Sequence, residues 1–323
     1  MEIPEGIELR PITPEDLPQV HRVMRRSEVK DNEPMVTQFD EVVSEYEAPF
    51  FDPESDSRLG VDHEGRVVAW AKVWYRPSTV REHRAYLFGG VDPEWRRRGV
   101  GTAVFNWQLQ RARQLVTEAE PELPRVVRTA SWDWLEDAIA LYERFGLEPV
   151  RYNDVLSRSL AEPIPVTAID GADLVPWGEV DSEQVRKAHN EAFADHWGST
   201  PIPRESWEHM GSASDFRPDL SFVALAEGDV VGYARNAVYP EDWETIGRKE
   251  GWVEQLGVRR SWRKRGVAST LLAASMNAFL EDGLDHAALG VDTDNPTGAY
   301  GLYQRLGFVP RHRSVTHQLT IAR

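Results

Sequence analysis

The sequence predicts an α/β (α+β) protein made of two tandem copies of one domain, each with a mixed sheet flanked by helices. The chain has 323 residues, enough for about two domains of roughly 100–200 residues each. Hydrophobic residues make up 41% of the chain and charged residues 28%, a composition that supports a folded core. Segments with strand and helix patterns also follow one another in the same order in both halves.

Two motifs recur in the same order in the two halves. Residues 91–101 read VDPEWRRRGVG and match VRRSWRKRGVA at 258–268. The second motif, LYERFGL at 141–147, matches LYQRLGF at 302–308. The chain is therefore most simply two copies of one domain of about 160 residues.

In the first half, period-two alternation predicts strands and helical spacing of apolar residues predicts helices. Thr13, Pro14 and Asp16 form a start signal for the first helix: an N-cap, a first-turn proline and an acid three residues after the cap. The expected strands are 7–11, 66–75, 84–91, 125–130 and 150–159, and further helices are expected at 99–115 and 135–145. Two prolines near 160–165 then mark the seam between domains 1–160 and 161–323.

The second half repeats this order. A hairpin is expected around Glu227 and Gly228, a pair with strong turn preference. The expected strands are 221–226, 229–237, 252–258, 286–292 and 313–321, and the expected helices are 181–195, 266–280 and 297–306.

Composition excludes several classes of function. The chain has no cysteine, which excludes disulfides, a thiol nucleophile and cysteine-ligated metal sites. Its nine histidines lack metal-site spacing, and no Gly-x-Ser-x-Gly motif occurs, so we expect no metal. No apolar run approaches about 20 residues, and the N-terminus lacks a signal-peptide pattern, so we expect a cytoplasmic protein with no membrane partner. The net charge of −16 predicts no nucleic-acid partner.

Each copy places a basic cluster between a strand and the small-residue start of a helix. A helix N-terminus exposes unpaired amides and attracts anions, phosphate above all. One such cluster could be a solvated basic turn, but recurrence at the same junction favours a phosphate site. The two loops with their helix starts comprise Arg96, Arg97, Arg98, Gly99, Val100, Gly101 and Thr102 in the first half, and Arg263, Lys264, Arg265, Gly266, Val267, Ala268 and Ser269 in the second.

The loops lack the nucleotide-loop motif and the third glycine of the dinucleotide fingerprint. The remaining pattern, Arg-x-x-Gly-x-[Gly/Ala], resembles the acyl-CoA pyrophosphate loop of the GNAT superfamily of N-acyltransferases. The motif Leu-Tyr-x-x-x-Gly-[Phe/Leu] resembles that family's later helix. The resemblance covers nearly the whole chain and implies two tandem GNAT-type domains with mostly antiparallel sheets. Residues 188–196 and 289–299 further resemble the actinobacterial two-domain group that includes mycothiol synthase.

The resemblance implies an N-acetyltransferase that uses acetyl-CoA and a small-molecule primary amine, which attacks the thioester directly. It assigns the acid for the departing thiolate to Tyr303, or to Tyr142 in the first half. It places Leu256, Gly257 and Val258 on a strand that splays from its neighbour, so that their backbone contacts the cofactor. We expect a local bulge at Gly257. Tyr303 could alternatively be an ordinary core aromatic.

Two further residues of the second half are carried over from the family. Glu254, on the face that alternation shares with Trp252 and Leu256, is the candidate base; alternatively it is an ordinary polar strand residue. Asn295 is a candidate cofactor contact, or alternatively a helix-entry residue. The first half has Gly89 and Gly90 in place of the Glu-bearing segment. We therefore expect catalysis in the C-terminal half, with the N-terminal half a cofactor-binding or structural copy.

Two other classes of function remain open from the sequence. One is a catalytically silent acyl-CoA-binding module, acting as a sensor or scaffold. The other is a tandem interaction protein without a cofactor. The resemblance leaves the acceptor open, because acceptor pockets come from variable loops, here 195–211 and 239–251. We expect a monomer or a homodimer.

Overall fold

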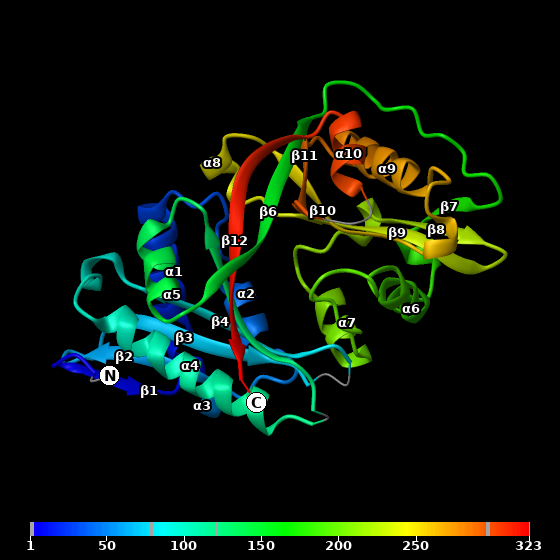
Figure 1. Ribbon diagram of the computed structural model, residues 1–323. Coiled ribbons are helices and arrows are strands. Elements are labelled where there is room, and N and C mark those ends of the chain that lie inside the picture. The colour runs from blue at the N-terminus through cyan, green and yellow to red at the C-terminus, as the bar shows by residue number, and fades with distance from the viewer. Residues whose placement is uncertain (1–2, 78–79, 121, 295–297, 323) are drawn as a thin grey trace. The chain divides into compact units, whose positions relative to one another are not determined.

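The computed structural model describes residues 3–77, 80–120, 122–294 and 298–322. Asn295 lies outside the described residues. The chain divides into two compact units, visible in Figure 1. Unit 1 comprises residues 1–151 and 314–323, and unit 2 comprises residues 152–313.

The units differ from the two halves of the sequence in two segments. The strand β6 (Glu148–Ser159) pairs through residues 153–159 with β11 (His286–Asp292) in unit 2. The last strand, β12 (Val309–Ile321), pairs through residues 314–321 with β5 (Arg125–Trp132) in unit 1. Each sheet is therefore completed by a strand from the other half of the sequence. Strand patterns alone could not show this exchange, because β6 and β12 close corresponding ends of the two copies.

Unit 1 is a mixed sheet with helices on both faces. Its strand order is β1-β2-β3-β4-β5-β12, in which only the described pairing of β4 with β5 is parallel. Ala69, Ala71 and Val73 pack on the side of α4, whereas Trp70 packs with α1 on the other face. The remaining elements are β1 (Ile7–Arg10), α1 (Leu17–Asp31), α2 (Phe39–Tyr46), α3 (Pro53–Asp56), β2 (Ser57–Asp62), β3 (Val67–Tyr75), β4 (His83–Val91), α4 (Val100–Glu118) and α5 (Glu136–Arg144).

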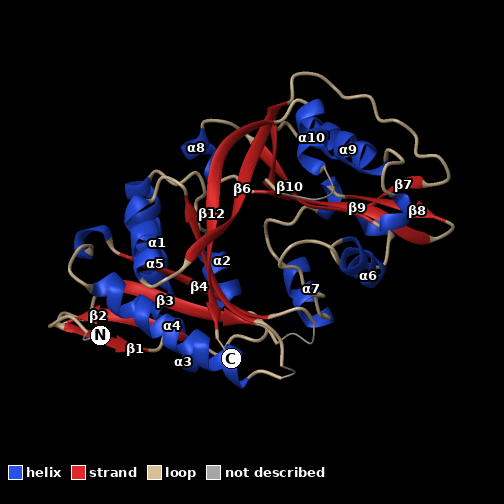
Figure 2. Ribbon diagram, in the orientation of Figure 1, coloured by secondary structure: helices blue, strands red, loops and turns tan. Residues whose placement is uncertain are grey.

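Unit 2 repeats this architecture, as the strands and helices of Figure 2 show. Its strand order is β6-β11-β10-β9-β8-β7, with β10 and β11 parallel. The helix α9 packs on one face through Leu271, Leu272 and Met276, and α6 and α7 pack on the other through Val185 and Trp207. The elements are β7 (Asp173–Pro176), α6 (Ser182–Ala192), α7 (Arg204–Gly211), β8 (Phe222–Ala226), β9 (Asp229–Val238), α8 (Asp242–Ile246), β10 (Glu250–Val258), α9 (Val267–Glu281) and α10 (Ala299–Arg305).

The main predicted elements are present, with shifts of a few residues at their ends. Thr13 and Asp16 form the expected capping box, and the expected hairpin turns at Glu227 and Gly228, both at positive φ. The sequence analysis missed α2, α3, α7, α8, β2 and β7. Most of these are short and packed on one side, so periodicity over a long window could not detect them.

Candidate active site

Strand β10 departs from regular pairing at Glu254. Val253 pairs with Asn236 of β9 and Gln255 pairs with Arg235, so Glu254 is an extra residue without a partner in β9. Such a bulge redirects a side chain and is common beside active sites. The expected bulge at Gly257 was wrong: the bulge lies three residues earlier.

The bulge changes which residues share a face. Leu256 and Val253 pack against the α9-side cluster, whereas Glu254 and Gln255 contact side chains of β9 on the other face. The expectation that Glu254 shares a face with Leu256 was therefore wrong. Strict alternation of side chains fails here because the inserted residue moves every later residue of the strand along by one position.

Unit 1 has no bulge at the corresponding place. β3 and β4 pair without interruption from Tyr75 with Ala85 to Ala69 with Val91. At the offset of the repeated motif, Leu87 occupies the position of Glu254, and Leu87 is buried in the core with Phe105. A one-residue difference in strand pairing thus turns a core position of unit 1 into an accessible acid in unit 2.

The splay expected from the resemblance is present in both units. β10 pairs with β11 only as far as Val253 and Leu289, and both strands continue beyond that point. In unit 1, β4 and β5 pair as far as Tyr86 and Arg128 and then continue separately.

The backbone beyond the splay has a defined orientation. The Arg259 amide donates to the Val231 carbonyl at 2.9 Å, so Arg259 and, by period two, Gly257 face β9. The amides of Leu256 and Val258 consequently point away from β9, toward the side from which β11 has diverged. These two amides are placed to meet an extended ligand.

Gly257 has a steric role in place of the expected bulge. A Cβ atom there would lie 2.4 Å from Cε1 of Tyr233. We expect Gly257→Ala to lower the free energy of unfolding by about 1–3 kcal/mol through overpacking, measured by chemical denaturation. The control is Gly290→Ala in neighbouring β11, where a Cβ would meet nothing within 4 Å. Equal stability of the two variants would contradict the steric role.

The two basic loops have nearly the same backbone. Arg97 and Gly99 have φ of 60° and 83°, and Lys264 and Gly266 have φ of 62° and 85°. These left-handed positions are uncommon for a charged residue, so their recurrence marks a conserved loop geometry within the chain. Each loop ends at the first turn of a long helix, α4 or α9.

The first arginine of each loop holds the loop in place. Arg96 Nε donates to the Val91 carbonyl at 3.2 Å, and Arg263 Nε donates to the Val258 carbonyl at 3.3 Å. Arg96 also forms a two-pronged ion pair with Asp31, at 2.6 and 2.7 Å. Arg263 donates to the Ala192 carbonyl at 2.7 Å. Both guanidinium groups are therefore engaged with other parts of the protein.

The other basic residues of the loops are more exposed. Arg98 lies over the Trp95 ring at 5.0 Å, and Arg265 lies over the Trp262 ring at 4.8 Å. Arg97 forms an exposed ion pair with Asp137 at 2.9 Å. An exposed pair of this kind contributes little stability and can exchange partners.

Beyond the loops lie helix N-termini with free amides. The first α-helical bonds run from Ala103 to Gly99 and from Thr270 to Gly266, each at 3.0 Å. The amides of the three residues before Ala103 and Thr270 precede this ladder and have no partner within the helix. In unit 2 these are the amides of Val267, Ala268 and Ser269. The Val267 side chain itself is buried, so it can serve a ligand only through its backbone.

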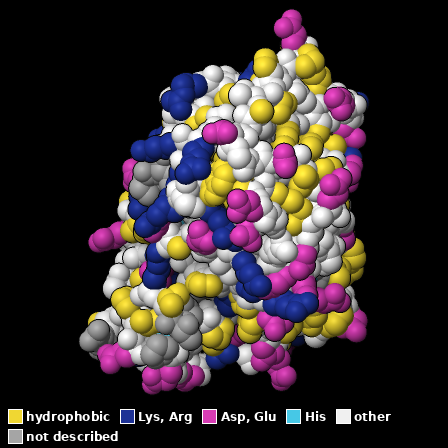
Figure 3. All heavy atoms as spheres, turned by 90° about the vertical axis from the view of Figure 1, so that its right-hand side faces the viewer, with side chains coloured by type: hydrophobic (Ala, Val, Ile, Leu, Met, Phe, Trp, Pro, Cys, Tyr) yellow, Lys and Arg dark blue, Asp and Glu magenta, His cyan; other side chains and the backbone are white. Residues whose placement is uncertain are grey.

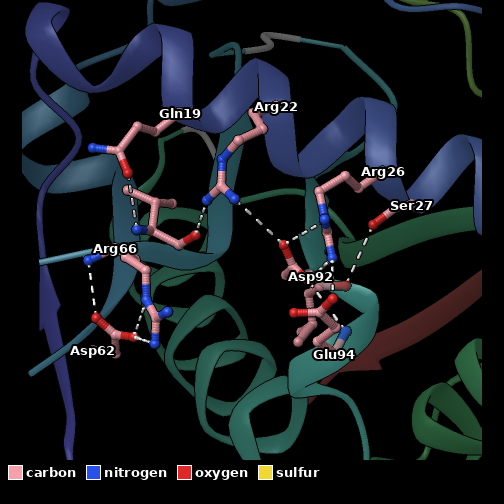
Figure 4. A network of polar contacts seen from close by, with 10 residues as sticks. Gln19, Arg22, Arg26, Ser27, Asp62, Arg66, Asp92 and Glu94 are labelled. Atoms are coloured by element: carbon pink, nitrogen blue, oxygen red, sulfur yellow. Dashed lines mark hydrogen bonds and ion pairs between the residues drawn. The ribbon is translucent and has the colours of Figure 1, made fainter. Parts of the chain in front are cut away.

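The start of each loop is anchored by charges of opposite sign. In unit 1, Arg26 of α1 contacts Asp92 at 3.0 Å and Glu94 at 2.9 Å, as Figure 4 shows. In unit 2 the position of Asp92 is taken by Arg259, which contacts Glu191 of α6 at 3.2 Å. The loop residue at this junction is therefore an acid in unit 1 and an arginine in unit 2, and each pairs with a helix residue of opposite charge. On the face shown in Figure 3, Lys and Arg side chains likewise lie among carboxylates.

Tyr303 lies in the core beside the splayed strand. It is 8% exposed and belongs to the cluster that contains Val253 and Val291 and against which Leu256 packs. Burial raises the pKa of Tyr303 to about 12, so its hydroxyl is a neutral donor at physiological pH. This position fits both the acid role and the alternative of a core aromatic.

In unit 1 a side chain bridges the gap between the diverging strands β4 and β5. The Thr129 hydroxyl, on β5 just beyond the last pair with β4, donates to the Leu87 carbonyl at 3.0 Å. Burial raises the pKa of Tyr142. In unit 2 the residue just beyond the last pair is Gly290, which faces open space. The splay is therefore closed in unit 1 by a side chain that unit 2 lacks.

The Glu254 carboxylate has two partners on the α6 and α7 side of the sheet. Arg235 Nη1 donates to Oε2, and the Tyr239 hydroxyl donates to Oε1. The Arg235 side chain is 5% exposed and that of Glu254 25%. Arg235 also donates to the Met210 carbonyl at 2.8 Å and lies 4.3 Å above the Phe216 ring.

Leu256 and Val258 thus lie with Tyr303 on the α9 side of β10, the strand that leads to the Lys264–Ser269 loop, whereas Glu254 lies on the opposite face of that strand. The sequence analysis missed Arg235 and Tyr239. One signal was available: Arg235 is a charged residue inside the otherwise largely apolar run 229–238. Tyr239 carried no motif. The described residues include no cluster of three or more His, Asp or Glu side chains arranged to hold a metal ion, and none of their helices is long and apolar enough to cross a membrane.

Comparison with known proteins shows the family. The Acetyltransferase (GNAT) family matches residues 21–147 and 182–308. A mycothiol acetyltransferase of Saccharomonospora viridis is 31% identical over 225 residues, covering 68% of this chain and 69% of that protein. A mycothiol acetyltransferase of Nocardia farcinica is 27% identical over 280 residues, covering 82% and 84%. The crystal structure of a GCN5-related N-acetyltransferase from Sphaerobacter thermophilus, 26% identical, matches with a TM-score of 0.77 over 100% of this chain and 98% of that one.

The repeated loops, the two splayed sheets and these matches agree with one another. The chain belongs to the acetyltransferase (GNAT) family, as a tandem acyltransferase with two GNAT domains that resembles the mycothiol synthase group.

Proposed function

We propose that the protein is an acetyl-CoA-dependent N-acetyltransferase that acetylates a primary amine of a small molecule in its C-terminal domain. One observation carries the assignment to that domain. The two units share the loop geometry, but the bulged acid Glu254 and the open splay beside Gly290 are found in unit 2.

The residues of unit 2 fit the coenzyme. The amides of Val267, Ala268 and Ser269 would hold its diphosphate at the N-terminus of α9, with Lys264 and Arg265 supplying charge. Arg263 would keep the loop in shape, and Gly257 would let the strand pass Tyr233. The amides of Leu256 and Val258 would bind the extended arm, with one of them donating to the thioester oxygen.

The chemistry requires removal of a proton from the amine and stabilisation of the departing thiolate. Glu254 would accept the amine proton, directly or through water. The Tyr303 hydroxyl would donate to the sulfur as the carbon–sulfur bond breaks. Thioester activation is the chemistry the coenzyme itself supplies. In unit 1, Arg97, Arg98 and the amides of Val100, Gly101 and Thr102 would offer a second anion-binding loop, with Arg96 structural there.

The test has a binding arm and a turnover arm. Lys264→Ala with Arg265→Ala removes two charged contacts, and we expect the Kd for coenzyme A to rise about 10–100-fold, measured by calorimetry. The matched control is Arg97→Ala with Arg98→Ala in unit 1, which should change this Kd less than threefold. Unchanged affinity in the unit 2 variant would overturn the coenzyme site.

The turnover arm separates an enzyme from a silent binding module. The wild-type protein is incubated with acetyl-CoA and a panel of ethanolamine, glucosamine, spermidine and kanamycin, and products are followed by mass spectrometry. We expect a mass gain of one acetyl group on at least one amine. Coenzyme binding without acetylation of any amine would support the silent module instead.

A further inference from the structure

The bulge in β10 places two consecutive side chains on one face of the unit 2 sheet. Glu254 binds Arg235 of β9 on the side of α6 and α7. Gln255 lies on the same side, beside Tyr233 of β9. Consecutive residues of a regular strand point to opposite faces, so without the bulge one of these two side chains would face α9. Their Cα atoms are about 3.8 Å apart, which keeps the carboxyl group and the amide group within reach of one small molecule.

Tyr233 holds the Gln255 side chain from the β9 side. Its ring is fully buried among residues of α6 and α7. The ring also lies against the backbone of Gly257, where a Cβ atom would come within 2.4 Å of Cε1. The Tyr233 hydroxyl donates to Gln255 Oε1 at 3.4 Å and is also hydrogen-bonded to His189 Nδ1 of α6 at 2.5 Å. Gln255 is therefore tied to a group whose own position is fixed by packing.

The amino group of the Gln255 amide is available to a ligand. Its carbonyl oxygen Oε1 faces Tyr233, and no residue in the described part of the chain hydrogen-bonds to Nε2. Gln255 is partly exposed, so a molecule bound beside Glu254 can meet these N–H groups. An amide NH2 group offers two donors, and its partner in a small molecule is therefore an oxygen or another hydrogen-bond acceptor.

Unit 1 keeps the packing around this position without the amide. By the offset of the repeated motif and the strand pairing, Trp70 of β3 stands in the place of Tyr233. A Cβ atom at its pairing partner Gly90 would lie 3.0 Å from the indole nitrogen of Trp70. The position of Gln255 is taken by Phe88, an exposed aromatic residue. The packing therefore does not need the amide, and the amide occurs in the unit that has the bulged acid.

We propose that Gln255 selects acceptors that have an oxygen atom on the carbon next to the one that bears the amine. The amine lies at Glu254, whose carboxyl group has acceptor sites beyond those used by Arg235 and Tyr239. The neighbouring hydroxyl or carbonyl oxygen accepts from Gln255 Nε2. This class comprises 1,2-amino alcohols, amino sugars and α-amino carbonyl compounds. Gln255 is a specificity-determining residue and Tyr233 a positioning residue. The inference rests on the proposed function, since it needs an amine bound at Glu254.

The test compares amines that differ in this oxygen: ethanolamine with propylamine, and glucosamine with cyclohexylamine, each with acetyl-CoA and the full-length chain. Gln255→Met has nearly the same length and no donor. We expect it to lower kcat/KM about 5–10-fold for the amines that have the oxygen, and to leave the others within about twofold. Gln255→Glu replaces the donor by an acceptor and should lose the preference as well. Differences in basicity between the amines cancel, because each variant is compared with the wild type on the same amine.

Gln304→Met is the matched control, because Gln304 is exposed on α10, and it should keep the wild-type preference. Tyr233→Phe removes the hydroxyl that holds Gln255 and should lower the preference about two- to threefold; if this variant does not fold, the Gln255 variants decide.

Three results would overturn this inference alone. They are an equal loss for both members of a pair in Gln255→Met, a preference that Gln255→Glu keeps, and wild-type acetylation of spermidine or propylamine as fast as of ethanolamine. If kanamycin is the amine acetylated, Gln255→Met must show the same loss on it. Failure of the wild-type protein to acetylate any amine would overturn the proposed function and this inference with it.

Discussion

Tyr303→Phe is expected to lower kcat about 100-fold, equivalent to about 2.7 kcal/mol of transition-state stabilisation. Burial raises the pKa of this phenol to about 12, whereas a thiol has a pKa of about 8.5. Full proton transfer from Tyr303 to the thiolate is therefore uphill by about 5 kcal/mol. The hydroxyl contributes mainly as a hydrogen-bond donor. The expected loss of kcat is therefore at the lower end of the range that is typical when a general acid is removed.

The raised pKa also sets the pH dependence. A neutral phenol is the active form, and it persists as the pH rises until the pH approaches the raised pKa of about 12. The wild-type kcat profile should therefore not fall between about pH 8 and 10 through loss of the Tyr303 proton. A steady-state profile of the wild-type protein over this range checks the expectation.

Tyr300→Phe is the control for Tyr303→Phe. Tyr300 is one helical turn earlier on α10, and its hydroxyl donates to Asp154 at 3.0 Å. Its loss should lower the melting temperature while leaving kcat within twofold. If Tyr303→Phe keeps the wild-type kcat, Tyr303 is a core aromatic and another group stabilises the thiolate.

Thr129→Gly is expected to raise the number of coenzyme A molecules bound per chain from one to two, measured by calorimetry. The variant removes both the Thr129 hydroxyl bond to Leu87 and the side chain that bridges the splay in unit 1. It gives unit 1 the glycine that unit 2 has at Gly290. The loop of unit 1 already has the backbone of its counterpart, so access for the extended arm is the missing condition.

Thr129→Ser keeps the hydroxyl and should retain a stoichiometry of one. Glycine in a strand costs about 1 kcal/mol, so a lower melting temperature without coenzyme is expected for Thr129→Gly. Two equivalent sites in the wild-type protein would show that the bridge does not exclude the coenzyme. A stoichiometry of one in Thr129→Gly would show that other parts of unit 1 exclude it.

Features encoded by local sequence were predictable. The loops 96–102 and 263–269, the later helices and most strands follow from repeated motifs and periodicity, and the structure confirms these elements. The splay was expected from the family resemblance, since local pairing rules give no reason for parallel neighbours to separate. The roles of Tyr303, Glu254 and the loop residues remain predictions.

Features that depend on pairing between distant segments were not predictable. The bulge at Glu254 arises because β10 places one residue more than β9 over the paired stretch, whereas β4 and β3 pair residue for residue. No property of residues 250–258 alone reveals that difference. The partners Arg235 and Tyr239 come together with Glu254 through the same pairing.

The exchange of β6 and β12 has a consequence for dissection of the chain. A fragment ending at residue 160 would lack residues 314–321 and so leave the β5 edge bare, while residues 153–159 would have no β11 to join. Bare edges invite pairing with other molecules. Recombinant halves cut at the midpoint should therefore precipitate or associate, whereas co-expression of both pieces could restore each sheet.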